Sequence, residues 1–270
     1  MNRTYVVTGA ASGIGAATAA YLRGRGGRVI ACDLRDGDVA ADLATADGRS
    51  ALVAGVTRLS GGKIDGIVAN AGGGPPPTSL ALNFFGAVAT LDGLRPLLKD
   101  SPAPRAVAVS SIASFSPVDP EVVEACLSMD EARATAAGWE YAKKIAPIEK
   151  MTPTQAMQVG LGLYANAKHS LNRWCRRVAV TPEWAGAGIV LNVVAPGFID
   201  TPAAAYIFAD PDRKAAMGQM VPMRGTYPAR PEQMAALLAW CVSEENSLMT
   251  GQILFADAGV ECAQRGERAW

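Results

Sequence analysis

The chain has 270 residues, 25 of them acidic and 25 basic, and these numbers exclude several classes of protein. A length of 270 fits one large α/β domain or two smaller ones, and it buries enough surface to fold without disulfides or metals. Zero formal net charge argues against nucleic acid or an anionic membrane as a partner. A single histidine, His169, cannot build a histidine-rich zinc site, and we expect no metal.

The cysteines contain no Cys-x-x-Cys pair, which excludes zinc ribbons and thioredoxin-like motifs. Their odd number and irregular spacing favour buried, reduced thiols in a cytoplasmic protein. The uncharged run over residues 66–91 carries three prolines, at 75–77, which argues against a membrane helix. The five cysteines are Cys32, Cys126, Cys175, Cys241 and Cys262.

Short β-branched runs alternate with longer stretches rich in alanine and leucine. Strands are predicted at residues 5–8, 28–32, 39–42, 64–69, 106–110, 189–194 and 252–256. Helices are predicted at residues 14–25, 50–59, 79–98, 164–180 and 232–242. This alternation, with nearly continuous apolar strands, is typical of a parallel sheet covered on both faces. We therefore predict one α/β domain over residues 1–270, with a doubly wound Rossmann-type sheet flanked by helices.

A glycine-rich turn separates the first predicted strand from the first helix. Small residues in this turn let the backbone approach a pyrophosphate, and the helix N-terminus supplies free N–H groups and partial positive charge. Such a turn is weak evidence alone, but here it opens the first βαβ unit of the chain. The residues that we expect to bind the cofactor in this turn are Gly9, Ser12, Gly13, Ile14 and Gly15.

Asp33 ends the second predicted strand, where a carboxylate can accept hydrogen bonds from the hydroxyls of the adenosine ribose. The same charge would repel a 2′-phosphate, so the sequence favours NAD over NADP. Arg35 keeps NADP open as an alternative, because an arginine can receive a phosphate.

Tyr164 is followed four residues later by a lysine. A free tyrosine has a pKa of about 10, too high for a good base near neutrality, and a nearby lysine cation lowers it. Among the six tyrosines only Tyr164 has a lysine four residues on, Lys168, and this spacing puts both on one helix face. We therefore predict Tyr164 as the general acid and base of hydride-transfer chemistry.

Several short motifs follow one another along the chain. They are Thr8 to Gly15, Asp33, Asn70-Ala71-Gly72, Asn83, Ser110-Ser111, Tyr164 to Lys168, and Pro196-Gly197-Phe198-Ile199-Asp200-Thr201. In this order they resemble the classical short-chain dehydrogenase/reductase family over nearly the whole chain. Within it, residues 33–36 and 41–49 are most similar to the branch of bacterial 3α-hydroxysteroid dehydrogenase/carbonyl reductases.

The resemblance implies catalytic roles. Ser111 is expected to hydrogen-bond the substrate oxygen, with Ser110 as the competing candidate. Lys168 is expected also to bind the nicotinamide ribose. Asn83 would kink its helix and hold a water that links Lys168 to solvent.

The resemblance also implies cofactor contacts and assembly. Asn70, Ala71 and Gly72 are expected to pack beside the cofactor, Asp42 and Leu43 to border the adenine, and Leu34 to bind the cofactor as well. Pro196 and Gly197 would lead into Ile199 and Thr201, which meet the nicotinamide carboxamide. The family relationship further implies a homodimer or homotetramer.

The stretch between Ser111 and Tyr164 is longer than in most family members. We predict a helical insertion over about 116–161, with helices at 121–129 and 130–146 and a short helix from Thr152. It could cap the substrate pocket or alter a subunit interface. Residues 203–223 form a second expected lid, with apolar character from Tyr206, Ile207, Phe208, Met217, Met220 and Met223.

These features predict an NAD-dependent oxidoreductase that interconverts a bulky hydrophobic secondary alcohol (steroid, terpenoid or aromatic) and its ketone. An aryl or primary alcohol dehydrogenase of the same family and a non-catalytic NAD-binding sensor are the alternatives. A serine hydrolase is set aside because no Gly-x-Ser-x-Gly elbow occurs. His169 follows Lys168 and points about 100° around the helix, which makes it a bystander.

Overall fold

Seven parallel strands form one sheet in the computed structural model, which describes residues 3–74 and 76–269. The strand order is β3-β2-β1-β4-β5-β6-β7, so successive strands are added first to one side of β1 and then, from β4, to the other. The doubly wound sheet predicted from the sequence is confirmed, although the third strand is shorter than the expected 39–42. The strands are β1 Thr4–Thr8, β2 Arg28–Asp33, β3 Val39–Ala40, β4 Gly66–Ala69, β5 Arg105–Val109, β6 Val190–Pro196 and β7 Ile253–Ala256.

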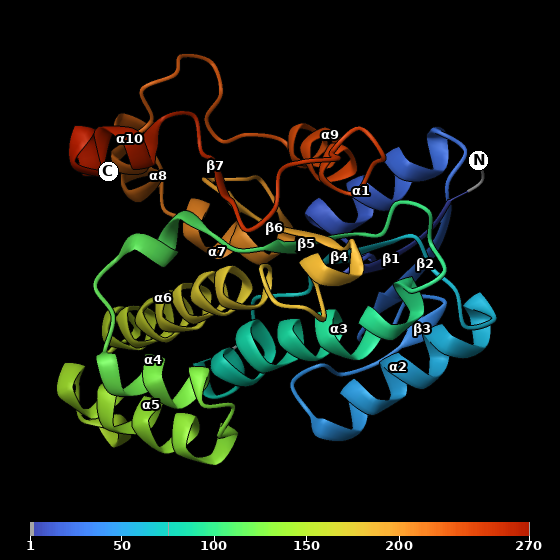
Figure 1. Ribbon diagram of the computed structural model, residues 1–270. Helices are drawn as coiled ribbons and strands as arrows, with labels where there is room; N and C mark the ends of the chain where they lie inside the picture. The colour runs from blue at the N-terminus through green and yellow to red at the C-terminus, as the bar shows by residue number, and fades with distance from the viewer. Residues whose placement is uncertain (1–2, 75, 270) are drawn as a thin grey trace.

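Helices cover both faces of the sheet (Figure 1). On one face α1 (Gly13–Gly24) and α9 (Pro231–Cys241) enclose a smaller core, which includes Val7 and Leu238. On the other face α2 (Ala46–Ser60), α3 (Ala87–Leu94) and α6 (Pro153–Val178) enclose the larger core. Every residue of β5 and β6 is buried, which explains why the strands read as nearly continuous apolar runs.

The segment predicted as one helix over 79–98 is three kinds of helix in succession. A π-helix at Ala81–Gly86 runs into α3, and a 3₁₀-helix at Arg95–Leu98 ends it. The prediction was wrong in type rather than in position, because single π-turns occur inside α-helices and 3₁₀-turns at their ends. Asn83 lies inside the π-helix. Pro75, part of the proline run before this segment, is outside the described residues.

The insertion forms two helices, α4 (Pro120–Leu127) and α5 (Glu131–Ile145), which lie beside α6 (Figure 1). Asp130 caps α5, since its side chain accepts a hydrogen bond from Arg133 N at 2.9 Å. Among the described residues, three ion pairs link segments of this region to one another or to α2: Arg133–Glu121, Lys144–Asp119 and Arg49–Glu131.

The predicted helix boundary before Tyr164 was wrong. Thr152 does not start a separate short helix, because residues 153–178 form one helix of 26 residues. Gly160 and Gly162 lie inside this helix, although glycine weakens a helix by roughly 1 kcal/mol relative to alanine. Each glycine makes room for a neighbour: a Cβ at 160 would lie 3.3 Å from Pro76 Cγ, and one at 162 would collide with the Tyr141 hydroxyl.

The remaining elements lie mainly near the C-terminus. They are α7 Ala205–Phe208, α8 Pro211–Gln219, α10 Val260–Arg265, and 3₁₀-helices at Pro76–Thr78, Ile112–Phe115, Ile148–Lys150, Ala185–Ala187, Pro202–Ala204 and Gly266–Ala269. All five cysteines are free, and Cys262 alone among them is exposed. Within residues 3–74 and 76–269, no helix is both long and apolar enough to cross a membrane.

Thr152→Ala should lower the free energy of unfolding by about 1 kcal/mol. The reason is the capping box at the start of α6: Thr152 Oγ1 accepts from Gln155 N at 3.3 Å, and Gln155 Oε1 accepts from Thr152 N at 3.0 Å. Urea unfolding followed by circular dichroism measures the change. Thr154→Ala is the control, because its exposed side chain makes no hydrogen bond with a described residue. Equal losses in both variants would contradict the capping role.

Candidate active site

A cavity of about 1260 Å³ lies at the carboxyl ends of the strands, where the strand order reverses. This is the position at which open α/β sheets bind their ligands. One end of the cavity is bordered by the glycine turn, Asp33 and Asp42, and the other by α6, Tyr141 and the segment 203–220. Both parts expected to act as lids therefore contribute to its wall.

The glycine turn has the geometry of a close-approach loop. Gly9 and Gly13 have φ angles of 66° and 52°, which favour glycine. A Cβ at Gly15 would collide with the Gly9 carbonyl, so α1 and the turn are packed as tightly as glycine allows. Ser12 begins α1 without a side-chain cap, which leaves first-turn N–H groups for an anion. These residues fit a pyrophosphate.

Asn70 joins the ends of β1 and β4 beneath this turn. Its backbone N donates to Thr8 Oγ1 at 3.0 Å, and its Nδ2 donates to Thr8 O at 3.0 Å. Ala71 N donates to the same Thr8 hydroxyl at 3.1 Å. These bonds hold Asn70, Ala71 and Gly72 at the cavity wall, where all three were expected.

Asp33 lies at the same end of the cavity as the glycine turn, at the end of β2. Its carboxylate accepts from Ala11 N at 2.9 Å and from Leu34 N at 2.7 Å, which fixes its orientation. Leu34, Asp42 and Leu43 line the cavity beside it. Arg35 is exposed and is not among the described lining residues.

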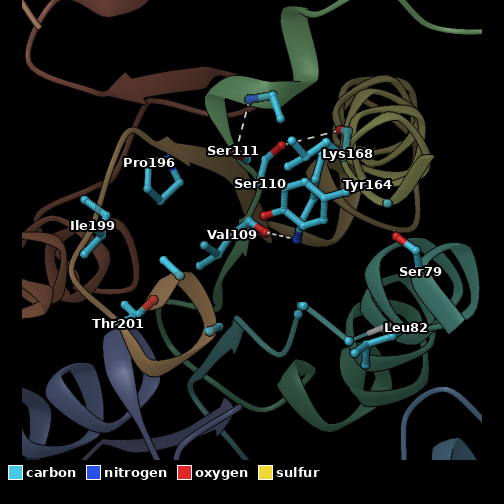
Figure 2. A pocket seen from close by; sticks show the side chains of 18 of the residues that line it. Ser79, Leu82, Val109, Ser110, Ser111, Tyr164, Lys168, Pro196, Ile199 and Thr201 are labelled. Carbon is cyan, nitrogen blue, oxygen red and sulfur yellow. Dashed lines mark hydrogen bonds between the residues drawn. The ribbon is translucent and has the colours of Figure 1, made fainter. Parts of the chain in front are cut away.

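Tyr164 and Lys168 lie one helical turn apart on α6 and face the cavity (Figure 2). Lys168 is 2% exposed, and its Nζ lies 5.5 Å from the centroid of the Tyr164 ring. The ammonium donates to Val109 O at 2.8 Å, at the carboxyl end of β5. The Ser111 hydroxyl accepts from Ala113 N at 3.1 Å, lies in the same cavity wall as Tyr164 and acts to lower the pKa of its phenol. The structure thus brings together three of the four residues predicted to be catalytic.

Burial moves the pKa values of this pair in opposite directions. It raises the pKa of Tyr164 to about 12, and the hydrogen bond from Ser111 offsets only part of this rise. It lowers the pKa of Lys168 to about 8. At neutral pH the phenol of the free protein therefore carries its proton and can donate it.

Asn83 is fully buried and its amide is fully used. Its Oδ1 accepts from Gly73 N at 2.9 Å, and its Nδ2 donates to Gly73 O at 2.9 Å and Ser79 O at 2.8 Å. The side chain thus fixes the Gly72–Gly73 backbone next to Lys168, because a Cβ at Gly72 would lie 2.9 Å from Asn83 Oδ1 and 3.3 Å from Lys168 Nζ.

The two serines after β5 differ in their surroundings. Ser110 is buried and its hydroxyl donates to Lys168 O at 3.4 Å (Figure 2), whereas the hydroxyl of the half-buried Ser111 acts to lower the pKa of the Tyr164 phenol. The geometry favours Ser111 over Ser110 as the group that meets a substrate oxygen. Across the cavity, Pro196, Gly197, Ile199 and Thr201 form the opposite wall.

His169 lies outside this constellation. Its Nδ1 is 2.9 Å from the carbonyl oxygen of Ser114, and the residue does not line the cavity. It holds the 3₁₀-helix after β5 against α6, as a structural residue would.

The sequence did not predict much of the cavity wall on the far side of Tyr164 from the glycine turn. Because α6 was expected to start near Tyr164, the earlier turns of this helix were not assigned to the cavity. Gln264 of α10 gave no signal at all, since only the fold brings the C-terminus here. The missed lining residues include Leu82, Phe115, Tyr141, Ala156, Met157, Gly160, Leu161 and Gln264.

Comparison with known proteins defines the family. Residues 3–123 match the family model described as short chain dehydrogenase, and residues 133–261 match the model described as enoyl-(acyl carrier protein) reductase. A 3-alpha-hydroxysteroid dehydrogenase/carbonyl reductase of Comamonas testosteroni is 35% identical over 267 residues, which cover 96% of this chain and 97% of that protein. The chain therefore belongs to the short-chain dehydrogenase/reductase family and is an oxidoreductase that binds a nicotinamide cofactor.

Two further relatives agree with this assignment. A cis-4-hydroxycyclohexanecarboxylate dehydrogenase of Sinomonas cyclohexanicum is 32% identical, with 95% of this chain and 96% of that protein covered. The crystal structure of a 3-alpha-hydroxysteroid dehydrogenase from Pseudomonas sp. B-0831, complexed with NADH, matches with a TM-score of 0.82 and 36% identity. That match covers 98% of this chain and 99% of the crystallised one. The resemblance inferred from the motifs is confirmed.

Asn83→Ala should lower the free energy of unfolding by about 2–3 kcal/mol, because it leaves the buried carbonyl of Ser79 and the part-buried N–H and carbonyl of Gly73 unpaired. Denaturant unfolding measures the loss. Asn172→Ala on α6 is the matched control, since Asn172 is also buried but its Oδ1 lacks a hydrogen-bond partner in the described chain. We expect the control to lose clearly less stability. Similar losses would show that Asn83 acts only by filling space.

Proposed function

We propose that this protein is an NAD-dependent oxidoreductase that interconverts a bulky, hydrophobic, uncharged secondary alcohol and its ketone. The observation that carries the proposal is the chemistry of the cavity wall beyond Tyr164, which is largely apolar and aromatic. Among the described lining residues the only cation is Lys168, and the only carboxylates are Asp33 and Asp42 at the opposite end. A carboxylate or phosphate on the substrate would find no partner there, whereas a hydroxysteroid, terpenoid or aromatic alcohol would bury its surface.

The choice of NAD rests on Asp33. Its carboxylate is anchored by two backbone N–H groups at the end of β2, where the adenosine ribose of a nucleotide in this cleft would lie. A 2′-phosphate there would meet a fixed negative charge, and Asp42 lines the same end. The NADH in the Pseudomonas relative supports the same choice.

The nicotinamide ring, when bound, supplies or accepts the hydride. The protein's own residues would handle the proton. Tyr164 donates its proton to the carbonyl oxygen during reduction and takes it from the hydroxyl during oxidation, while Ser111 hydrogen-bonds that oxygen. The Lys168 ammonium, held on Val109 O, stabilises the phenolate that forms in reduction. Asn83 positions the backbone beside this lysine.

Both full-length relatives bear on the substrate class. One is a hydroxysteroid dehydrogenase and the other acts on a hydroxycyclohexanecarboxylate, so secondary alcohols on saturated rings are common to both names. The described cavity residues include no cation besides Lys168, which favours an uncharged, steroid-like substrate over a carboxylate.

We further propose a cytoplasmic homodimer or homotetramer whose only other partner is its small substrate, with neither nucleic acid nor membrane bound. The balanced charge and the free cysteines support this. The insertion and the segment 203–223 would serve as lids, since both contribute to the cavity wall.

The purified protein should reduce NAD⁺ with neutral hydrophobic secondary alcohols such as a 3α-hydroxysteroid, menthol or 1-phenylethanol, followed by absorbance of the reduced nicotinamide. We expect kcat/KM for NAD⁺ to exceed that for NADP⁺ by at least about tenfold, because of the like charge at Asp33. Asp33→Ala should reduce this preference. Turnover only of primary aryl alcohols would favour the alternative of an aryl or primary alcohol dehydrogenase. No turnover across the panel would contradict the enzyme assignment. A preference for NADP⁺ would refute the role of Asp33.

Tyr164→Phe should lower kcat by about 10²–10⁴-fold, because the proton donor is removed while the ring remains. NADH binding, followed by fluorescence, should stay within about twofold of wild type. In the wild type the raised pKa of Tyr164 keeps the phenol protonated near neutrality, so alcohol oxidation should speed up with rising pH. Tyr21→Phe on α1 is the control. Retained turnover in Tyr164→Phe would show that another group moves the proton.

A further inference from the structure

The insertion touches the cofactor end of the molecule as well as the substrate end. Glu131, the first residue of α5, receives both ends of the Arg49 guanidinium, with Nη1–Oε2 at 2.9 Å and Nη2–Oε1 at 2.7 Å. Arg49 lies in the first turn of α2, far from the insertion in sequence. A bidentate pair of this kind fixes orientation as well as distance. The Arg49 side chain is 14% exposed, so solvent screens it less than a surface pair.

Arg49 also holds the loop that precedes α2. Its Nε donates to Thr45 O at 3.1 Å, and its Nη2 lies 3.5 Å from Ala44 O. Thr45 in turn donates from both its backbone N and its hydroxyl to Asp42 O, each at 3.0 Å. One guanidinium thus connects Glu131 with the short loop over residues 42–45.

This loop forms part of the cavity wall at its Asp33 end. Asp42 and Leu43 line the cavity. The loop is packed closely from below, because a Cβ at Gly48 would collide with Asp42 O and one at Gly86 would lie 2.9 Å from Leu43 O. The Arg49 guanidinium contacts the carbonyls of Thr45 and Ala44 in this loop, so the group that orients Arg49 also bears on the position of the loop.

We infer that Glu131 is a positioning residue for cofactor binding: through Arg49 it holds the loop over residues 42–45 in the place that receives the adenosine half of the cofactor. The inference rests on the proposed nicotinamide dinucleotide site, with its adenosine at Asp33. It gives the insertion a role besides covering the substrate. The same helix, α5, places Tyr141 in the cavity wall at the substrate end and Glu131 behind the cofactor loop.

The test uses the full-length protein and two probes, AMP and NADH, titrated by calorimetry and by nucleotide fluorescence. Glu131→Gln should raise Kd for both probes by about fivefold, the size expected for a partly exposed ion pair. Glu131→Asp, which keeps the charge, should lose less. With NAD⁺ saturating, kcat should stay within about twofold of wild type, because the reacting end is untouched. Arg49→Lys keeps the cation but not the bidentate geometry, and it should raise Kd for AMP by a similar factor.

Glu121→Gln is the matched control. Glu121 pairs with Arg133 inside the insertion, at Nη2–Oε1 2.6 Å, and touches neither α2 nor the cofactor loop. Its loss should leave both Kd values unchanged. Unchanged AMP affinity in folded Glu131→Gln, or an equal loss in the control, would overturn the inference. A wild-type protein that binds neither AMP nor NADH would overturn it together with the proposed cofactor. Nucleotide binding that changes as expected, without oxidation of any alcohol, would refute the proposed reaction alone.

Discussion

The buried ammonium of Lys168 is the constraint on which the rest of the site depends. A cation at 2% exposure is costly, and the lowered pKa of about 8 reflects that cost. Among the described residues, the one direct hydrogen-bond partner that offsets this cost is the carbonyl of Val109 at the end of β5. Three features must stay in place around the Lys168 ammonium. They are the register between β5 and its neighbours, the path of α6 and the Gly72–Gly73 backbone. Asn83, buried in its π-helix, holds the last of these.

The long α6 turns that local constraint into a substrate site. If this helix began near Tyr164, the phenol would stand at the edge of the fold. Because the helix instead starts at Pro153 behind a capping box, its earlier turns place Met157 and Leu161 on the same wall as Tyr164. The two glycines in these turns would weaken an isolated helix, but they allow Pro76 and Tyr141 to approach. Packing therefore overrides helix propensity here.

The parts that sequence could predict are those encoded locally. The glycine turn, Asp33 and the Tyr164–Lys168 pair are fixed by short-range spacing, so their positions in the structure agree with expectation. The start of α6 and the π-helix at Ala81–Gly86 were missed, since both depend on contacts between segments distant in sequence. The roles of Gln264 and Tyr141 in the wall were missed for the same reason. Whether the insertion faced the pocket was left open by sequence, and the lining residues on α5 and α6 place it there.

The insertion also explains how an enlarged substrate wall can coexist with an ordered fold. Additional helices lose conformational entropy on folding, so they need anchors. Small apolar contacts supply part of this: Ala134 and Ala142 are fully buried, and Gly138 packs against Leu80 and Leu163. Charged anchors at the two ends of α5, Glu131 to Arg49 and Lys144 to Asp119, supply direction. Asp119 in turn is tied through its backbone N to Asn166 of α6, at 2.9 Å, one turn from Gly162. The insertion is thus fastened to the catalytic helix α6 and, through Arg49, to the helix α2, while Tyr141 of α5 lines the cavity itself.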